Sequence, residues 1–172
     1  KDSKFSDGTR ITATHVQMSF ARLFRLGASM AAAIDYIAGG TKFKESQDLS
    51  NFGVKAIDPS TVEFRLDRPS AIFLKQIAVV DCAILPITDF KQDPNISVGG
   101  GFSGPYKLTT NIENGSLTLQ KWRKDVLDSK LPPEKVVYSL TEEKPLDLAT
   151  SGQTDTLDRD RINPDDKKKL EA

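Results

Sequence analysis

Apolar residues recur at helical spacing near the start of the chain. The stripe from Val16 to Phe24 places its apolar side chains three and four positions apart, which indicates one buried face of a helix. Thr12 is a favourable N-cap for that helix, although His15 stands where a glutamate or glutamine would complete a capping box. Gly27 is the expected end of the helix, because glycine readily adopts the left-handed conformation found there.

A second helix is expected over Ser29–Ala38, since this run is rich in alanine and is closed by Gly39 and Gly40. The following residues, 41–51, are polar and show neither helical nor strand periodicity. We therefore expect them to form a loop.

Strict alternation of apolar and polar residues begins at Thr61–Leu66, which predicts a half-buried strand. A turn at Asp58–Ser60 joins this run to Phe52–Ile57, so the two should form a β-hairpin. A short helix is expected to start at Pro69. Ala83–Ile87 is a short apolar run interrupted by Pro86.

The composition changes between Gln92 and Gly101, where Asp-Pro-Asn is followed by three glycines, and this is the best internal boundary. A second hairpin is expected beyond it, because Glu113-Asn114-Gly115 is a strong turn signal. The elements expected in this second half are strands at Tyr106–Thr110, Leu117–Trp122 and Lys135–Leu140, a short helix at Pro145–Thr150, and a helical tail from Asn163.

Composition narrows the class of protein. The chain has 172 residues with 24 basic and 24 acidic side chains, so its formal charge is zero and it lacks the basic bias that nucleic-acid binding needs. Hydrophobic residues make up 38% and charged residues 28%, as in globular proteins. The apolar runs are short, so no direct membrane span is expected.

Residues that could carry chemistry are few. His15 and Cys82 are the only histidine and cysteine, so an ordinary zinc site cannot form, and we expect no metal and no cofactor. His15 is expected to be solvated or to cap its helix, and Cys82 to be a small buried residue rather than a reactive thiol. The acidic cluster at Asp155–Asp160 lacks the glycine and glutamate of a calcium-binding loop.

Two other patterns have no catalytic meaning. The glycine run Gly99–Gly104 is followed by a strand and lacks the lysine of a phosphate-binding loop, so it is interpreted as a link. Glu142 and Glu143 are adjacent and tend to point apart, which makes them a poor acid–base pair. No catalytic residue is therefore predicted, and an acid–base hydrolase is the least favoured hypothesis.

Four short phrases follow one another along the chain. They are Lys4-Phe5-Ser6-Asp7-Gly8 with Ile11-Thr12-Ala13, then Gly53-Val54-Lys55-Ala56-Ile57-Asp58, then Ser103-Gly104-Pro105-Tyr106-Lys107-Leu108, and then Ala149-Thr150-Ser151-Gly152-Gln153-Thr154-Asp155. In this order they resemble the amino-terminal part of the family 5 extracellular solute-binding proteins of bacterial ABC importers, which bind oligopeptides, dipeptides and nickel complexes. The resemblance also implies a strand at Ile84-Leu85-Pro86, after the short helix. This chain differs from the family pattern at Arg10, His15 and Phe102, where the family has proline, aspartate and glycine.

The resemblance implies an α/β fold of mixed α+β type, forming part of a two-lobed periplasmic binding protein of type II. Residues 1–98 would be the small subdomain inserted in lobe I and residues 99–172 part of lobe I, with the second lobe absent. It also implies a fragment of an importer's binding component, which delivers a peptide or other small solute to ABC permease subunits without catalysis. The location implied is periplasmic or extracellular, with a lipoprotein anchor to the membrane.

Family position also suggests which residues face the ligand. The segments Val79–Cys82 and Phe102–Tyr106 would line the cleft, which makes Asp81, Cys82, Phe102 and Tyr106 the candidate ligand-binding residues. Some relatives have a basic residue at the first segment. Asp81 and Cys82 cannot replace it in holding an anionic group, because a carboxylate repels an anion.

A different class of function stays open. The chain could instead be a stand-alone protein-interaction module derived from such a lobe, with an exposed apolar patch that binds a protein partner. The flanking coding sequence separates the two hypotheses, since a longer reading frame supports the importer component and a gene of this length supports the module.

Overall fold

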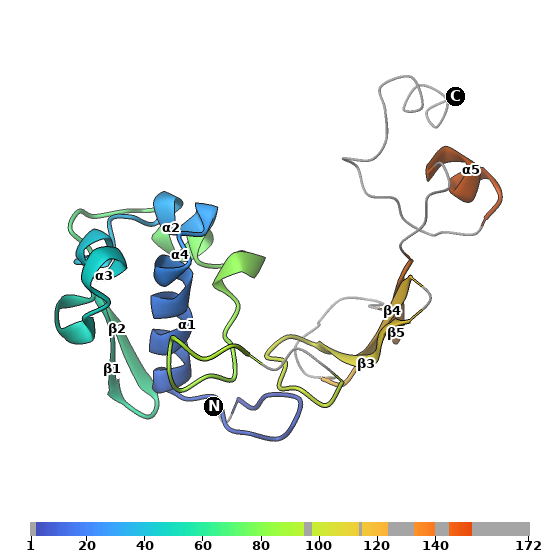
Figure 1. Cartoon of the computed structure of the whole chain (residues 1–172), viewed down its shortest axis with the longest axis horizontal. Coiled ribbons are helices and arrows are strands. Elements are labelled where there is room, and N and C mark those ends of the chain that lie inside the picture. The colour runs from blue at the N-terminus through green and yellow to red at the C-terminus, as the bar shows by residue number, and fades with distance from the viewer. Residues whose placement is uncertain (1–2, 95–97, 114, 124–132, 140–144, 153–172) are drawn as a thin grey trace.

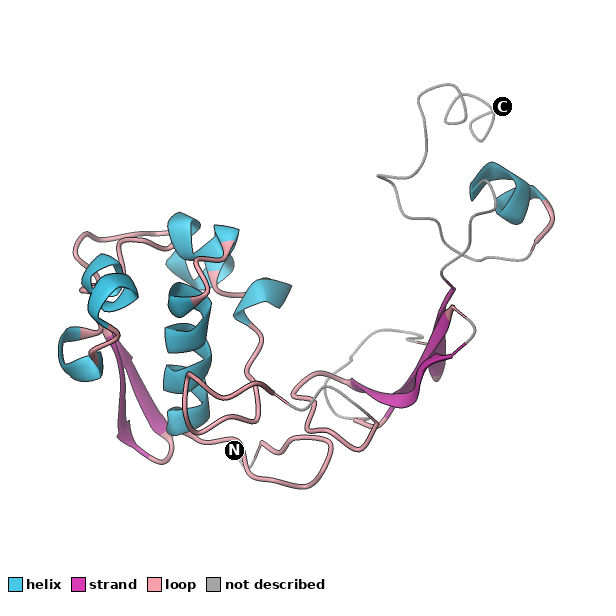
Figure 2. Cartoon of the chain, in the orientation of Figure 1, coloured by secondary structure: helices cyan, strands magenta, loops and turns pink. Residues whose placement is uncertain are grey.

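The computed structural model describes residues 3–94, 98–113, 115–123, 133–139 and 145–152. Helices α1–α4 and strands β1 and β2 form one body, and strands β3–β5 form a separate sheet beside it (Figures 1 and 2). The helical elements are α1 (Ala13–Arg25), α2 (Ser29–Ala33), α3 (Gly40–Ser46), α4 (Phe73–Gln76) and α5 (Pro145–Thr150), with 3₁₀ turns η1 (Leu49–Asn51) and η2 (Val80–Cys82). The strands are β1 (Val54–Asp58), β2 (Thr61–Phe64), β3 (Tyr106–Glu113), β4 (Ser116–Lys121) and β5 (Lys135–Ser139).

Helix α1 confirms the first prediction, including its apolar face and its end before Gly27, which adopts a φ of 63°. Its N-terminus corrects one expectation. The backbone amide of Thr12 donates to Nδ1 of His15 at 3.0 Å, so His15 completes the capping box, although it is neither a glutamate nor a glutamine. His15 therefore has the expected capping role, but it is buried and not solvated.

The second predicted helix was too long. Helix α2 ends at Ala33, because the residues that follow make their backbone contacts with another segment. Ile37 forms an isolated antiparallel bridge with Leu66, and the Ala38 amide donates to the Arg65 carbonyl at 2.9 Å. Pairing with the extension of β2 thus outweighs the helix propensity of the alanine-rich run.

The predicted loop at 41–51 was also wrong, since α3 and η1 occupy most of it. Gly39 precedes α3 with a φ of 70°, so the two glycines begin a helix instead of closing one. Phe43 is the buried anchor of α3, and a single apolar residue in so short a helix produces no visible periodicity.

The first hairpin is confirmed: β1 and β2 pair antiparallel, with Val54 opposite Phe64. Helix α4 begins at Phe73, later than the start predicted at Pro69. The strand that the family resemblance implied at Ile84–Pro86 is wrong, because Ala83–Ile87 has no regular structure. The Leu85 amide donates to the Ser19 hydroxyl at 2.9 Å, where a strand would use a neighbouring carbonyl, and Pro86 has no amide to donate.

The second hairpin and the third strand of the second half are confirmed. β4 lies between β3 and β5, and both pairings are antiparallel. Gly115, with a φ of 73°, takes part in the turn between β3 and β4, and α5 has the bounds that the sequence predicted.

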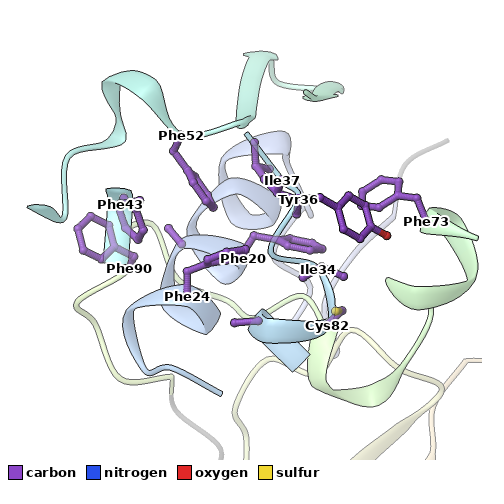
Figure 3. Close-up of a cluster of buried hydrophobic side chains, with 13 residues drawn as sticks. Phe20, Phe24, Ile34, Tyr36, Ile37, Phe43, Phe52, Phe73, Cys82 and Phe90 are labelled. Atoms are coloured by element: carbon purple, nitrogen blue, oxygen red, sulfur yellow. The ribbon is translucent and has the colours of Figure 1, made fainter. Parts of the chain in front are cut away.

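The hydrophobic core lies within the first body (Figure 3). Aromatic rings meet edge to face across it, for example Phe24 with Phe52 at 5.4 Å and Phe43 with Phe90 at 5.2 Å between centroids. Among the described residues, the buried cluster draws on no residue of β3–β5. Its members are Phe20, Ala21, Phe24, Ala31, Ile34, Tyr36, Ile37, Phe43, Phe52, Val54, Phe73, Cys82 and Phe90.

Three predictions lie outside the described residues: the pair Glu142–Glu143, the acidic cluster at Asp155–Asp160 and the helical tail from Asn163. Of the helices that the structure describes, none is long and apolar enough to cross a bilayer.

Candidate ligand-binding site

The first candidate segment, Val79–Cys82, places its neighbouring side chains in opposite environments. Asp81 is exposed, and Val80 before it is 86% exposed. Cys82 is only 8% exposed and belongs to the core cluster. The η2 turn, Val80–Cys82, therefore exposes the side chains of Val80 and Asp81. It is anchored through Cys82, which lies in the core cluster (Figure 3).

The thiol of Cys82 is chemically quiet. Burial raises its pKa above the ordinary value, and the neighbouring carboxylate of Asp81 raises it further. Because the thiolate is the reactive form, both effects oppose nucleophilic chemistry. This agrees with the expectation that Cys82 is a small buried residue.

We expect the folded chain to react with Ellman's reagent at least about tenfold more slowly than the same chain in denaturant, because burial and the raised thiol pKa both limit the thiolate. Absorbance of the released thionitrobenzoate measures the two rates. A free cysteine peptide in the same denaturant is the control. Equal rates in the folded and denatured chains would contradict the buried position of Cys82.

The second candidate segment, Phe102–Tyr106, leads into β3. Phe102 is partly buried, and its backbone is held by Ser6: the Ser6 amide donates to the Phe102 carbonyl, and the Phe102 amide donates to the Ser6 hydroxyl, both at 3.0 Å. Tyr106 is the first residue of β3, opposite Lys121, and its hydroxyl donates to the Pro133 carbonyl at 2.6 Å. Tyr106 is partly buried and is not a member of the core cluster.

The two segments adjoin through the residues next to them. A Cβ built on Gly101 would lie 3.0 Å from Cβ of Pro86 and 3.0 Å from Oδ2 of Asp7, so the chain after η2 touches the chain before Phe102. Within the described residues, no hydrogen bond or ion pair joins Asp81 or Cys82 to Phe102 or Tyr106. Within the glycine run Gly99–Gly104, the three residues Gly100–Phe102 lie between the first body and the sheet, and we term these three residues the link.

A groove of about 540 Å³ lies elsewhere on the first body, and the sequence did not predict it. Its charged side chains are exposed and of both signs, so they are solvated and offset one another. Nothing in the sequence joins its lining residues into a motif, because they come from four separate segments. They are Asp35, Ala38, Gly39, Gly40, Thr41, Lys42, Asn51, Arg65 and Asp67.

The described part of the chain brings no three histidine, cysteine, aspartate or glutamate side chains into a group that could hold a metal ion. The two candidate segments offer the exposed carboxylate of Asp81, the apolar side chains of Val79 and Val80, and the partly buried aromatic rings of Phe102 and Tyr106. Such surfaces bind ligands by burial and hydrogen bonding.

Comparison with solved structures identifies the class of fold: the chain matches part of the two-lobed periplasmic binding proteins of the oligopeptide-binding type. The substrate-binding domain of an oligopeptide ABC transporter from Bacillus anthracis superposes with a TM-score of 0.70 at 25% identity, over 90% of this chain and 32% of that structure.

Residues 1–172 match the family described as bacterial extracellular solute-binding proteins, family 5 middle, and the chain belongs to this family. Two proteins of Escherichia coli K12 are similar in sequence. The periplasmic oligopeptide-binding protein OppA is 30% identical over 71% of this chain, and the probable D,D-dipeptide-binding periplasmic protein DdpA is 28% identical over 72%. The chain spans 22% and 20% of their lengths.

Proposed function

We propose that this chain is part of the substrate-binding component of an ABC importer for peptides or related small solutes, and that it performs no catalytic step. The observation that carries the proposal is the family match over residues 1–172. The similar proteins OppA and DdpA, named as oligopeptide- and dipeptide-binding proteins, support a peptide as the ligand. The partners in this proposal are the permease subunits of the importer.

The proposed location is outside the cytoplasmic membrane, with the protein held at the membrane by a lipid anchor. The family is one of extracellular proteins, and both similar Escherichia coli proteins are named as periplasmic, which supports the first part. Incorporation of labelled palmitate into the cell-associated protein tests the lipid anchor.

We assign residues 1–98 to a small subdomain inserted in the first lobe and residues 99–172 to part of that lobe. Two observations support this division. The core cluster lies between Phe20 and Phe90, and β3–β5 pair with one another beyond the link. The boundary itself falls at Gly99, which adopts a φ of 84°.

In this proposal, Asp81, Cys82, Phe102 and Tyr106 lie along the ligand cleft. The exposed apolar side chains of Val79 and Val80 support a surface that a ligand or a second lobe covers. Because the Cys82 side chain is buried, it contributes by holding the η2 backbone, while Asp81 is the exposed polar group of the segment.

Calorimetry tests the proposed function with a defined mixture of di- to pentapeptides. We expect no measurable heat of binding to the 172-residue chain, since a cleft between lobes needs both walls to enclose a ligand. The complete reading frame that contains this segment is expected to bind the mixture, and Tyr106→Ala in that protein to weaken binding, with Leu74→Ala as the exposed control.

Two results would contradict the proposal. One is micromolar binding of peptides to the 172-residue chain alone. The other is a complete protein that binds neither peptides nor other small solutes.

A stand-alone interaction module remains the second candidate, because α4 and η2 expose several apolar side chains. Ile72, Leu74 and Val80 are all more than half exposed. A coding sequence limited to these residues, together with a concentration-dependent dimer in sedimentation equilibrium, would favour the module. A reading frame that continues well beyond them would exclude it.

A further inference from the structure

The only histidine of the chain is held as a hydrogen-bond acceptor. His15 is 7% exposed, and its ring packs edge to face on Phe5 with the centroids 5.1 Å apart. Nδ1 accepts from the Thr12 backbone amide at 3.0 Å and lies 2.9 Å from the Thr12 hydroxyl. Because a backbone amide can only donate, Nδ1 carries no proton, and the ring is the neutral tautomer protonated at Nε2.

Protonation is incompatible with this arrangement. The imidazolium carries a hydrogen on both nitrogens, so Nδ1 and the Thr12 amide would become two donors facing each other at 3.0 Å. The charged ring must therefore leave its place, and it then loses both the helix cap and the contact with Phe5.

The ring lies against a turn that reaches across to the link. Phe5 is fully buried, and its amide donates to the Thr9 carbonyl at 2.8 Å, which closes the turn. Ser6, the next residue, exchanges two hydrogen bonds with the Phe102 backbone and donates its hydroxyl to the Gly100 carbonyl at 3.0 Å. Three hydrogen bonds thus join Ser6 to the link, and Phe5 joins Ser6 to His15.

The charged groups around His15 act in both directions. Asp7, in the same turn, favours the imidazolium, whereas burial disfavours it more strongly and lowers the His15 pKa below its ordinary value of 6.5. The backbones of Lys4 and Arg10 form an isolated antiparallel β-bridge at the base of the turn, and both side chains are exposed. Asp58 is also exposed, next to Pro59, whose carbonyl accepts from the Ala13 amide. Neither Ala83–Thr88, which follows η2, nor the link Gly100–Phe102 carries an ionisable side chain, and Asp89 is the first such residue after η2.

We propose that His15 is a pH-sensitive latch, whose protonation displaces the Phe5–Thr9 turn and releases the hydrogen bonds from Ser6 to the link between the helical body and the β3–β5 sheet. Above pH 6.5 the ring is neutral and contributes its full stabilisation to the state in which Ser6 is hydrogen-bonded to the link. Because the pKa of His15 is lowered in the folded chain, this stabilisation is lost as the pH falls below 6.5 through the folded-state pKa.

Nuclear magnetic resonance of the 172-residue chain between about pH 7.5 and pH 4.5 tests the latch. The imidazole signal of His15 gives its midpoint, which we expect below 6.5. The amide signals of Ser6 and Phe102 should shift with that same midpoint. A histidine that acts only as a local cap would move the Thr12 amide and leave Phe102 unchanged.

Two variants separate the latch from general acid effects. In His15→Gln the side-chain carbonyl accepts from the Thr12 amide but does not titrate, so the Phe102 shift should disappear while the helix stays capped. In Ser6→Ala, His15 should still titrate but the Phe102 shift should be smaller, because only the backbone amide of residue 6 still donates to the Phe102 carbonyl. The proposal is overturned if Phe102 stays constant while His15 titrates in the wild type, if its shift persists in His15→Gln, or if it is undiminished in Ser6→Ala.

Discussion

Replacing Phe52 by alanine is expected to lower the free energy of unfolding by about 3–5 kcal/mol, the usual cost of removing a buried aromatic ring. Phe52 is fully buried, and its ring meets Phe24 at 5.4 Å and Phe43 at 4.7 Å between centroids. It therefore joins α1 and α3 across the centre of the core (Figure 3). A small domain has a total stability of roughly 5–15 kcal/mol, so this change removes a large part of it.

Urea unfolding followed by far-ultraviolet circular dichroism measures the effect. Leu74→Ala is the matched control, because Leu74 is 75% exposed and its truncation should cost no more than about 0.5 kcal/mol. A similar shift of the midpoint in both variants would show that Phe52 does not pack as described.

Replacing Gly53 by alanine is expected to lower the free energy of unfolding by about 3 kcal/mol, the upper end of the cost of overpacking. Three backbone segments meet at this glycine. Gly53 donates to the Ala38 carbonyl at 2.6 Å, Arg65 donates to the Gly53 carbonyl at 2.7 Å, and Ala38 donates to the Arg65 carbonyl at 2.9 Å. A Cβ on Gly53 would lie 2.6 Å from the Arg65 oxygen and 2.7 Å from the Ala38 oxygen.

Because all three neighbours are backbone atoms, the overlap cannot be relieved by turning a side chain, and the ring of hydrogen bonds must open. Thermal unfolding of Gly53→Ala against Gly104→Ala tests this, since a Cβ on Gly104 meets nothing within 4 Å. The expected result is a clearly lower melting temperature for Gly53→Ala alone. Wild-type melting of Gly53→Ala would contradict the three-way junction.

The elements that the sequence predicted well are those whose pattern repeats locally. Helix α1 has an apolar face several turns long, and both hairpins have a turn signal between two strand-like runs. Periodicity of this kind depends on which face is buried and not on what buries it.

The elements that it predicted badly depend on a distant partner. The end of α2 depends on Leu66 and Arg65, with which Ile37 and Ala38 pair. The absence of a strand at Ala83–Ile87 depends on Ser19, whose hydroxyl takes the Leu85 amide. Neither partner can be recognised from the residues of the segment itself.

The candidate site shows the same division. Family position selected Val79–Cys82 and Phe102–Tyr106, but it could not distinguish the exposed Asp81 from the buried Cys82. It also missed Ser6, which holds the Phe102 backbone from 96 positions away. A serine in a turn has many uses, so only the folded arrangement identifies this one.

By itself, the sequence determined that this is a chain of zero formal charge with the family 5 phrases, one amphipathic helix and two hairpins. These features depend on hydrophobic periodicity and turn-forming residues, which are properties of residues close together in the sequence. The tertiary structure alone decided where α2 ends, how Gly53 joins three segments, and that Ser6, in the turn beside the His15 ring, holds the link. Those features depend on hydrogen bonds and packing between residues far apart in the chain, whose free energy outweighs local propensity.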